Sequence, residues 1–200
     1  MIKIGIFGGT FDPPHFGHIN LALQIMEARN LEEVWFCPVR ISPHKQHLPP
    51  TPIEQRLEML RLAIASVPRT LITEVEIRRP GPSYTIDTIN NLLSDPHNRD
   101  IRFSLILGDD ALPNFCKWHK PQEIVNKVPI WIGRRLPQPI SVKDCVSDPE
   151  IAKALEKGVT DTKLMDITAT EIRSRLSKGL YCGHLVPEKV LDYIYKNKLY

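Results

Sequence analysis

The amino-acid sequence predicts a doubly wound α/β fold built on a mainly parallel sheet. Short apolar runs alternate along the chain with segments in which apolar residues recur at the helical period. The first two runs flank one helical segment within about forty residues, which is typical of a β-α-β unit with a right-handed crossover. A length of 200 residues suits a single domain, 1–200, with a helical C-terminal portion from about residue 168.

The first fifty residues contain the clearest elements. Residues 2–7 form a mostly apolar run ended by glycines, as expected of a buried strand. Apolar residues at helical spacing from residue 16 predict a helix to about residue 29, and residues 34–39 form a second strand. Residues 40–50 show no periodicity, and a loop of this length is often functional.

A helix with strong start signals is expected after this loop. Thr51 is the predicted N-cap, Pro52 the first helical residue, and Glu54 the reciprocal partner in a capping box. Residues 71–77 then alternate apolar and polar side chains, which predicts a third strand.

The second half of the chain continues the alternation. The expected elements are, in order, a turn over 78–85, a helix, a strand over 101–107, a short helix before Trp118, a strand over 128–132, a weak strand and a helix around 151–157, and a sixth strand over 163–167. Thr168 and Glu171 form a second capping box, whose helix is stopped by Gly179, and the last helix begins at Pro187.

Composition narrows the class of partner. The net charge of +3 is mildly basic, which suits small anionic substrates but is too weak and dispersed to indicate nucleic acid. The four cysteines are scattered without a C-x-x-C pair, as in a reduced protein. No signal peptide and no apolar run of about 20 residues is visible, so we expect a cytoplasmic protein without a membrane span.

Residues 8–18, Gly-Gly-Thr-Phe-Asp-Pro-Pro-His-Phe-Gly-His, carry the most chemistry. Paired glycines after a strand let the backbone approach a phosphate, and the following helix points free N–H groups at the anion. His15 and His18 are three residues apart, so on one helix face both imidazoles can reach the same phosphate, and Gly17 clears space between them.

This stretch has two other interpretations. It could be a tight turn with two incidental histidines, or half of a zinc site, although no third ligand is obvious. It is neither a Walker loop nor a G-x-G-x-x-G fingerprint. Combined with Thr10 and the strand-helix context, the phosphate interpretation is favoured.

Four further places have both a structural and a functional interpretation. The segment from Thr168 to Arg173 is either a well-capped helix start or a second anion site. The cations His44 and Lys45 lie in a loop that is either solvated or binds a phosphorylated substrate. Trp118 alone would be a core aromatic, and Gly108 with Asp110 could hold ribose hydroxyls at a strand end.

Together these motifs resemble those of the His-x-Gly-His nucleotidyltransferase superfamily, and more closely those of the bacterial nicotinate-nucleotide adenylyltransferase family. The resemblance covers nearly the whole chain and implies a Rossmann-like nucleotidyltransferase fold. The matching segments are residues 8–18, Pro43-His44-Lys45, residues 81–85, Gly108-Asp109-Asp110, Lys117-Trp118 and residues 167–173.

The resemblance implies a role for each matched position. The implied ATP-binding residues are Gly8, Gly9, Thr10, Phe11, His15, His18, Gly108, Asp110, Ile167, Thr168, Thr170 and Arg173, of which His15, His18 and Arg173 are catalytic. The implied residues for nicotinate mononucleotide are His44, Lys45, Thr85, Trp118 and His119. Trp118 would stack on the pyridine ring, while backbone N–H groups near Thr85 and His119 would take its carboxylate.

Two positions depart from the family pattern. Thr168 stands where serine is usual, which keeps the hydroxyl, and His119 stands where tyrosine is usual. If the contact at His119 is a backbone N–H, the exchange matters little. Asp109 receives no role.

The implied reaction joins ATP and nicotinate mononucleotide to give deamido-NAD and pyrophosphate, a step of NAD biosynthesis. Mg²⁺ would be bound with the ATP phosphates, and no metal is expected on protein ligands alone. The rival within the superfamily acts on NMN, phosphopantetheine or a cytidylyl substrate. A rival of another class is a nucleotide sensor without turnover or a nucleic-acid-binding module. The sequence leaves a homo-oligomer open.

Overall fold

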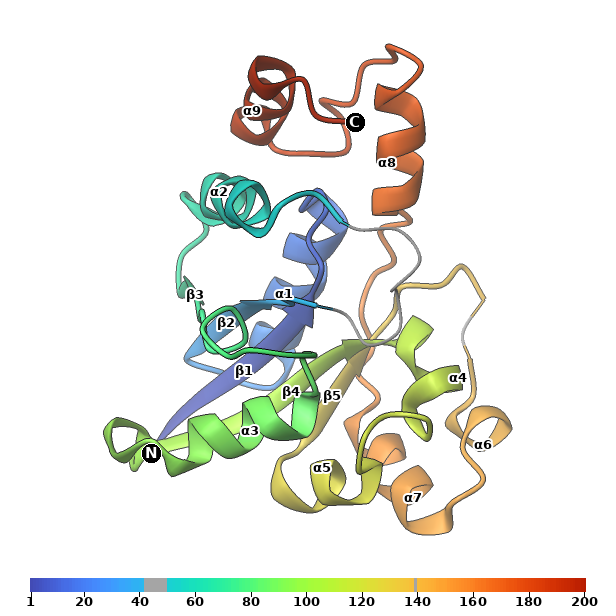
Figure 1. The fold of residues 1–200 in the computed structure, drawn as a ribbon. Coiled ribbons are helices and arrows are strands. Elements are labelled where there is room, and N and C mark those ends of the chain that lie inside the picture. Colours follow the sequence, from blue (N-terminus) through green and yellow to red (C-terminus); the bar gives the residue numbers. More distant parts are fainter. Residues whose placement is uncertain (42–49, 139) are drawn as a thin grey trace.

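The computed structural model describes residues 1–41, 50–138 and 140–200, which form a central sheet with helices on both faces (Figure 1). Within these ranges the sheet has five strands in the order β3-β2-β1-β4-β5, and every neighbouring pair is parallel. The strands are β1 (Ile2–Gly9), β2 (Glu33–Pro38), β3 (Thr70–Ile72), β4 (Ile101–Gly108) and β5 (Ile130–Gly133). The predicted doubly wound parallel sheet is confirmed.

The helices divide into two groups, one for each hydrophobic core. One core joins α1 (Phe16–Ala28), α2 (Ile53–Ile64), α8 (Ala169–Leu176) and α9 (Glu188–Asn197) to one face of the sheet. The other core joins α3 (Thr85–Ser94), α4 (Leu112–Phe115), α5 (Pro121–Lys127), α6 (Val142–Cys145) and α7 (Pro149–Gly158). Because α8 and α9 share a core with α1 and α2, the C-terminal helices pack on the body of the fold. A single domain stays a prediction that this packing supports.

The strand order sets where a ligand can be bound. The chain builds outward from β1 to β2 and β3, and then returns to place β4 on the other side of β1. In open α/β sheets, ligands bind at the carboxyl ends of the strands where the order reverses. Here that point lies between β1, which ends at Gly9, and β4, which ends at Gly108. The two glycine-containing turns singled out in the sequence therefore begin at neighbouring strand ends.

The predicted capping box at Thr51 is wrong. Helix α2 begins at Ile53 with Pro52 as its N-cap, and no side-chain cap bond is formed. Thr51 instead donates its backbone N–H to Oδ2 of Asp12 at 3.2 Å. Its backbone is thus fixed by the turn after β1, which removes it from the cap position.

The third strand is shorter than predicted, because β3 covers only Thr70–Ile72. The alternating residues that follow form a turn in which the N–H of Arg78 donates to the carbonyl of Glu74. Glu76 is buried, and its Oε1 accepts a hydrogen bond from the hydroxyl of Thr88 at 2.7 Å. A polar contact to α3, rather than strand pairing, therefore explains the buried positions here.

The predicted sixth strand over 163–167 is also wrong: the structure assigns no strand to these residues. Side chains of α1 take the backbone bonds that a neighbouring strand would have formed. Asn20 and Gln24 donate to the carbonyl of Lys163 at 3.1 and 3.0 Å, and Gln24 accepts its N–H at 2.6 Å. The weak strand expected between 134 and 162 is reduced to one bridge, between Ile132 and Val159.

Most of the predicted helices are confirmed. Helix α7 and the helices at Thr168 and Pro187 are present, while α5 and α6 were not anticipated. Among the described residues, no helix combines the length and apolar character needed to cross a membrane.

Candidate active site

The histidine pair lies where β1 turns into α1. His15 is the N-cap of α1 with extended backbone angles, so it precedes the helix rather than sharing a face with His18. Its backbone N–H donates to Nδ1 of His18 at 3.3 Å. The two ring centroids are 3.7 Å apart and the planes are tilted by 30°. The structure therefore brings the two imidazoles together as predicted, but through a cap rather than through helical spacing.

The bond to Nδ1 defines the chemistry of His18. A neutral imidazole donates from one ring nitrogen and accepts at the other. Since Nδ1 of His18 accepts the N–H of His15, the ring proton belongs on Nε2. The Nε2–H group is then a donor whose direction is fixed by the backbone.

His15 has a different character because its side chain is only 1% exposed. Burial, together with the nearby positive charge of Arg135, lowers the pKa of His15 from 6.5 to about 3. The ring is therefore neutral at physiological pH. A Cβ at Gly17 would stand 3.0 Å from Nδ1 of His15, so glycine is required for the close approach of this ring.

The side chain of Phe11 packs behind the histidine pair. Its side chain is 1% exposed and lies within the hydrophobic core, with φ of 50°. The ring makes edge contacts with His18 and Phe36, with centroids 5.0 and 5.6 Å away. The aromatic side chain of Phe11 therefore packs against the imidazole of His18.

The segment for which the sequence predicts a second anion site lies next to this turn. Thr168 caps α8, and its hydroxyl accepts the N–H of Glu171 at 3.1 Å. Nη1 of Arg173 donates to the carbonyl of Asp12 at 2.7 Å, and Nη2 donates to the hydroxyl of Thr170 at 3.3 Å. Segments far apart in the sequence thus meet, and the positive start of α8 lies next to the turn after β1.

Arg135 lies at the same edge of the sheet, and the sequence interpretation gave it no role. It follows the end of β5, and its Nη2 donates to the carbonyl of Ile167 at 3.3 Å. A Cβ at Gly108 would lie 2.4 Å from Cγ of Arg135 and 2.3 Å from Oδ1 of Asp110, so both side chains cover this glycine. The signal was available, because Arg134 and Arg135 directly follow a predicted strand, as ligand-binding residues often do.

Asp109, to which no role was given, positions Arg135. Its side chain is buried, and Oδ1 accepts the backbone N–H groups of Arg135 and Leu136 at 2.7 and 3.1 Å. The carboxylate thereby joins the turns after β4 and β5. Asp110 is exposed at the same edge, as a residue that contacts a ribose needs to be.

Asp12 is a buried hydrogen-bond acceptor whose partners the sequence did not reveal. Its side chain is buried, and the two oxygens accept the N–H of Thr51 and the hydroxyl of Tyr200 at 3.2 and 2.5 Å. Arg56, also buried, donates to the carbonyls of Thr10 and Thr51 at 2.8 and 2.9 Å. These bonds fix the turn after β1 against α2 and the C-terminal segment.

The residues expected to hold the second substrate lie around the start of α3. Thr85 is the first residue of that helix. The ring of Tyr84 lies 4.8 Å from the ring of His119, and the ring of Trp118 lies 5.2 Å from that of Phe115. The start of α3 and the segment after α4 are therefore side by side, as the sequence predicted. His44 and Lys45 lie outside the described residues.

Comparison with known proteins decides the family. The cytidylyltransferase-like family model matches residues 6–175. A probable nicotinate-nucleotide adenylyltransferase of Geobacillus kaustophilus is 40% identical over 100% of this chain and 87% of its own length. One of Dictyoglomus thermophilum is 40% identical over 100% of both chains. The chain belongs to the nicotinate-nucleotide adenylyltransferase family of cytidylyltransferase-like proteins.

The fold of this nicotinate-nucleotide adenylyltransferase family member also matches a solved structure. The nicotinic acid mononucleotide adenylyltransferase of Plasmodium falciparum, complexed with NaAD, superposes with a TM-score of 0.75 over 100% of this chain and 97% of that chain. The two sequences are 19% identical, so this likeness concerns the fold alone. It agrees with the Rossmann-like architecture that the motifs implied.

Proposed function

We propose that this protein transfers the adenylyl group of ATP to nicotinate mononucleotide, giving deamido-NAD and pyrophosphate in NAD biosynthesis. The observation that carries the proposal is the contact of Arg173 with the carbonyl of Asp12, which joins the start of α8 to the histidine turn. Donors for a triphosphate then surround one place at the carboxyl edge of the sheet. The names of the relatives point to the same reaction.

The chemistry requires positioning and charge stabilisation rather than a general base. The phosphate of nicotinate mononucleotide is already an anion at neutral pH. One of its oxygens forms a bond to the α-phosphorus of ATP while the bond from that phosphorus to the β-phosphate oxygen breaks, and pyrophosphate leaves with the electron pair. In-line displacements of this kind are accelerated chiefly by pre-placed donors.

The donors have distinct roles in this proposal. The fixed Nε2–H of His18 stabilises charge that develops around the α-phosphate. Arg173, the hydroxyls of Thr168 and Thr170, and the free N–H groups at the start of α8 hold the leaving pyrophosphate. The ring of His15 is neutral, so it supports the transition state as a hydrogen-bonding group and as the stacking partner of His18.

The residues present fit Mg²⁺ that is bound with ATP. Among the described residues, no group of three or more His, Cys, Asp or Glu side chains could hold a metal ion. Mg²⁺ readily keeps several waters and binds through substrate phosphates, where it neutralises the charge of the triphosphate. Asp110, exposed beside the ribose position, is the described carboxylate at this edge that could contact one of those waters.

Selection of the acceptor is assigned to the second group of residues. Backbone N–H groups near Thr85 and His119 would bind the nicotinate carboxylate, and Trp118 would stack on the pyridine ring. A carboxylate accepts charge-assisted bonds from N–H donors, whereas the amide of a nicotinamide substrate brings its own competing N–H group. The site therefore favours nicotinate mononucleotide. Assembly into a homo-oligomer and a cytoplasmic location stay predictions.

The deciding experiment measures pyrophosphate release from ATP with nicotinate mononucleotide, NMN, phosphopantetheine, or no acceptor. We expect rapid release with nicotinate mononucleotide and at least about 10-fold slower release with NMN, since one charge-assisted contact is lost. Equal rates with the two mononucleotides would remove the nicotinate assignment. ATP binding without turnover on any acceptor would indicate a nucleotide sensor instead.

A further inference from the structure

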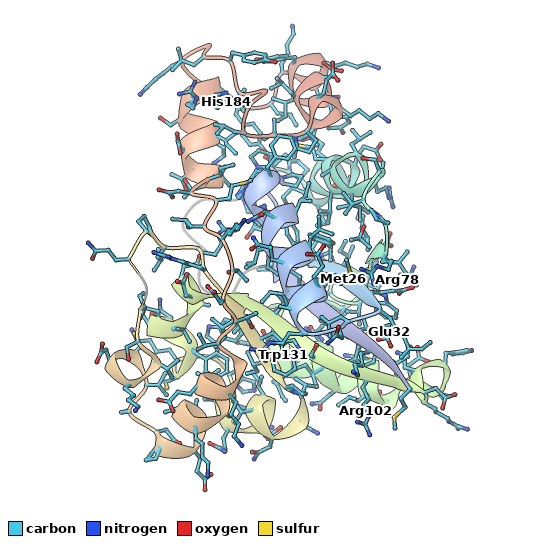
Figure 2. The ribbon with its side chains drawn as sticks, turned by 180° about the vertical axis from the view of Figure 1, so that it is seen from behind. Met26, Glu32, Arg78, Arg102, Trp131 and His184 are labelled. Atoms are coloured by element: carbon cyan, nitrogen blue, oxygen red, sulfur yellow. The ribbon has the colours of Figure 1, made fainter. Side chains whose placement is uncertain are left out.

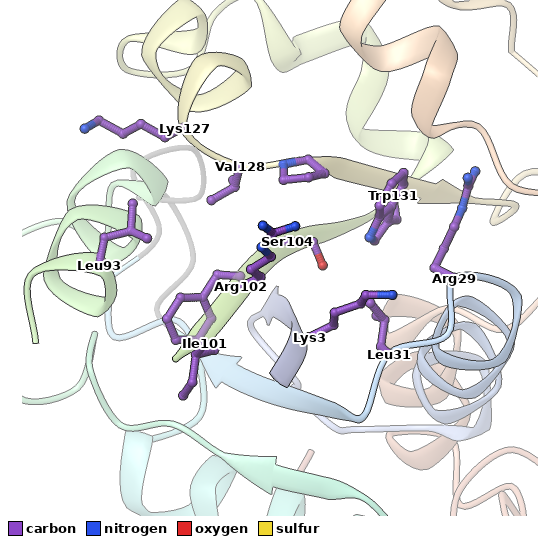
Figure 3. A pocket seen from close by; sticks show the side chains of 12 residues that line it. Lys3, Arg29, Leu31, Leu93, Ile101, Arg102, Ser104, Lys127, Val128 and Trp131 are labelled. Atoms are coloured by element: carbon purple, nitrogen blue, oxygen red, sulfur yellow. The ribbon is translucent and has the colours of Figure 1, made fainter. Parts of the chain in front are cut away.

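A hollow of about 470 Å³ opens at the amino ends of β1 and β4, on the opposite edge of the sheet from the histidine pair (Figure 3). Lys3 and Arg102 are register partners, so their side chains lie on the same face of the sheet. Ser104 is two residues further along β4 and shares that face. Trp131 pairs with Ile106 and completes the wall from β5.

The charge of this hollow has one sign. Its lining includes Lys3, Arg29, Arg102 and Lys127, and none of the lining residues, all within the described part of the chain, is aspartate or glutamate. The ion pairs found among the described residues involve none of these four cations. Glu32 lies beside Lys3, but its Oε2 accepts the backbone N–H of Lys3 at 2.7 Å. Figure 3 shows Lys127 extending away from the hollow, so an anion there would chiefly meet Lys3 and Arg102.

The tryptophan supplies a second, independent observation. Nε1 of Trp131 is buried and has no hydrogen-bond partner within the described ranges. A buried donor without a partner is costly, and native structures usually satisfy it with a ligand or water. In Figure 3 the indole of Trp131 lies between Arg29 and Ser104, in the wall of the hollow.

Arg29 holds this indole in place. Its guanidinium lies 4.4 Å from the centre of the Trp131 ring. It also donates to the carbonyls of Gly158 and Val159 at 3.1 and 2.7 Å, and to the hydroxyl of Thr160 at 2.8 Å. Arg29 thereby covers one face of the ring and fixes the segment after α7. The wall is built on rigid elements, unlike a chance gathering of surface lysines.

The remaining lining is apolar, with Leu31, Leu93, Ile101 and Val128 among its side chains. Small-molecule sites typically combine such walls with a few polar groups in a volume of about 300–1,000 Å³. We propose that this hollow binds a small organic anion, with a carboxylate or phosphate head between Lys3, Arg102 and the Trp131 N–H and an apolar ring against the aliphatic side chains. The site is separate from the catalytic edge.

The experiment uses 1-naphthyl phosphate as the probe and the full chain labelled with ¹⁵N in its indole groups. The chain has three tryptophans, and a Trp131→Phe variant identifies the resonance of Trp131. We expect a saturable shift of that resonance with 1-naphthyl phosphate. Two control compounds should bind at least about 10-fold more weakly: 1-naphthol, which lacks the phosphate, and inorganic phosphate, which lacks the apolar ring.

A double variant, Lys3→Ala with Arg102→Ala, tests the cations without touching the catalytic residues. Both side chains are exposed, so the fold should tolerate their loss. Affinity for 1-naphthyl phosphate should fall roughly 10-fold, since each exposed ionic contact is worth up to about 5-fold, while adenylyl transfer is unchanged. The proposal is overturned if Trp131 does not respond, if only Trp118 at the catalytic edge responds, or if the double variant binds as tightly as the wild type.

Discussion

The two halves of the candidate active site are built in different ways. The half for ATP is held by buried groups and long-range hydrogen bonds. His15 is buried, Arg173 donates to the carbonyl of Asp12, and the hydroxyl of Tyr200 donates to the carboxylate of Asp12. The half for the acceptor rests on fewer contacts, and its groups are more accessible, since His119 is exposed and Trp118 is partly exposed. Rigid placement of donors favours the transition state, whereas an open aromatic wall chiefly contributes to substrate binding.

This difference predicts how substitutions divide between kcat and KM. Changes in the ATP half should lower kcat because they remove donors that act as charge develops. Changes in the acceptor half should raise KM for nicotinate mononucleotide while leaving kcat nearly intact, since they remove binding that substrate and transition state share. Two buried titratable groups extend the contrast: His15 lies in the ATP half, and Glu76 is bonded to α3, whose start belongs to the acceptor half.

The largest effect is expected for His18→Ala. Loss of a pre-placed donor should lower kcat by about 10²-fold or more, with a much smaller change in the Kd of ATP. Steady-state pyrophosphate release and a binding titration measure the two quantities. His184→Ala, at an exposed histidine far along the chain, is the matched control and should keep full activity. A near wild-type kcat in His18→Ala would remove the assignment of this residue.

Arg173→Ala should be the next most damaging change. It removes the bond to the carbonyl of Asp12 and a cation for the pyrophosphate, so kcat/KM for ATP should fall by about 10- to 100-fold. Arg175→Ala is the control on the same helix, because that guanidinium donates to the carbonyl of Tyr181 instead. If both variants lose activity equally, disruption of α8 rather than a phosphate contact is the cause.

Trp118→Ala tests the acceptor half. Stacking of a heteroaromatic ring on an aromatic side chain is worth about 1–3 kcal/mol, so KM for nicotinate mononucleotide should rise roughly 10-fold. The value of kcat should stay within about 2-fold, and Trp118→Phe should recover most of the loss. A fall in kcat with unchanged KM would contradict the division between the two halves.

The ATP half was also the easier half to predict from the sequence. Residues 8–18 carry their glycines, histidines and strand-helix context within one short stretch, so local rules predicted that the two imidazoles meet, although not that His15 would be the N-cap. Arg135 and Asp12 were missed as partners because their contacts join segments far apart, at Ile167 and Tyr200. No periodicity encodes such long-range bonds, although the position of Arg135 after a strand was a usable signal.

The two errors about strands share one physical cause: polar side chains form hydrogen bonds in segments that the sequence pattern assigned to strands. Gln24 binds both backbone groups of Lys163, and this replaces the predicted sixth strand. Glu76 turns inward to Thr88, which ends the third strand early. In both places tertiary hydrogen bonds, which a local sequence pattern does not encode, decided the conformation.

The pH dependence of stability should reveal the buried His15. Its pKa is about 3 in the folded protein and 6.5 otherwise, so between these values only the unfolded chain binds the proton. Stability should therefore fall as the pH drops below 6.5, by about 1.4 kcal/mol per pH unit for this group. His15→Asn keeps a good N-cap residue and should lose this dependence when unfolding by urea is followed at several pH values. Identical pH profiles for His15→Asn and wild type would show that His15 is not the group responsible.

Glu76 should give a smaller effect of opposite sign. Burial raises the pKa of this carboxyl, despite the hydrogen bond from Thr88, so the folded protein holds the proton more tightly than the unfolded chain. Its contribution to stability is present at low pH and is lost as the pH rises through the folded pKa. Glu76→Gln keeps an acceptor for Thr88 but cannot ionise, so its stability gain over the wild type should be larger at pH 8 than at pH 5. Thr88 lies in α3, whose first residue is Thr85. The difference between Glu76→Gln and the wild type in KM for nicotinate mononucleotide should therefore also be larger at pH 8 than at pH 5, whereas kcat should not differ. If Glu76→Gln changes the stability equally at pH 5 and pH 8, the ionisation of Glu76 does not contribute to the pH dependence of stability.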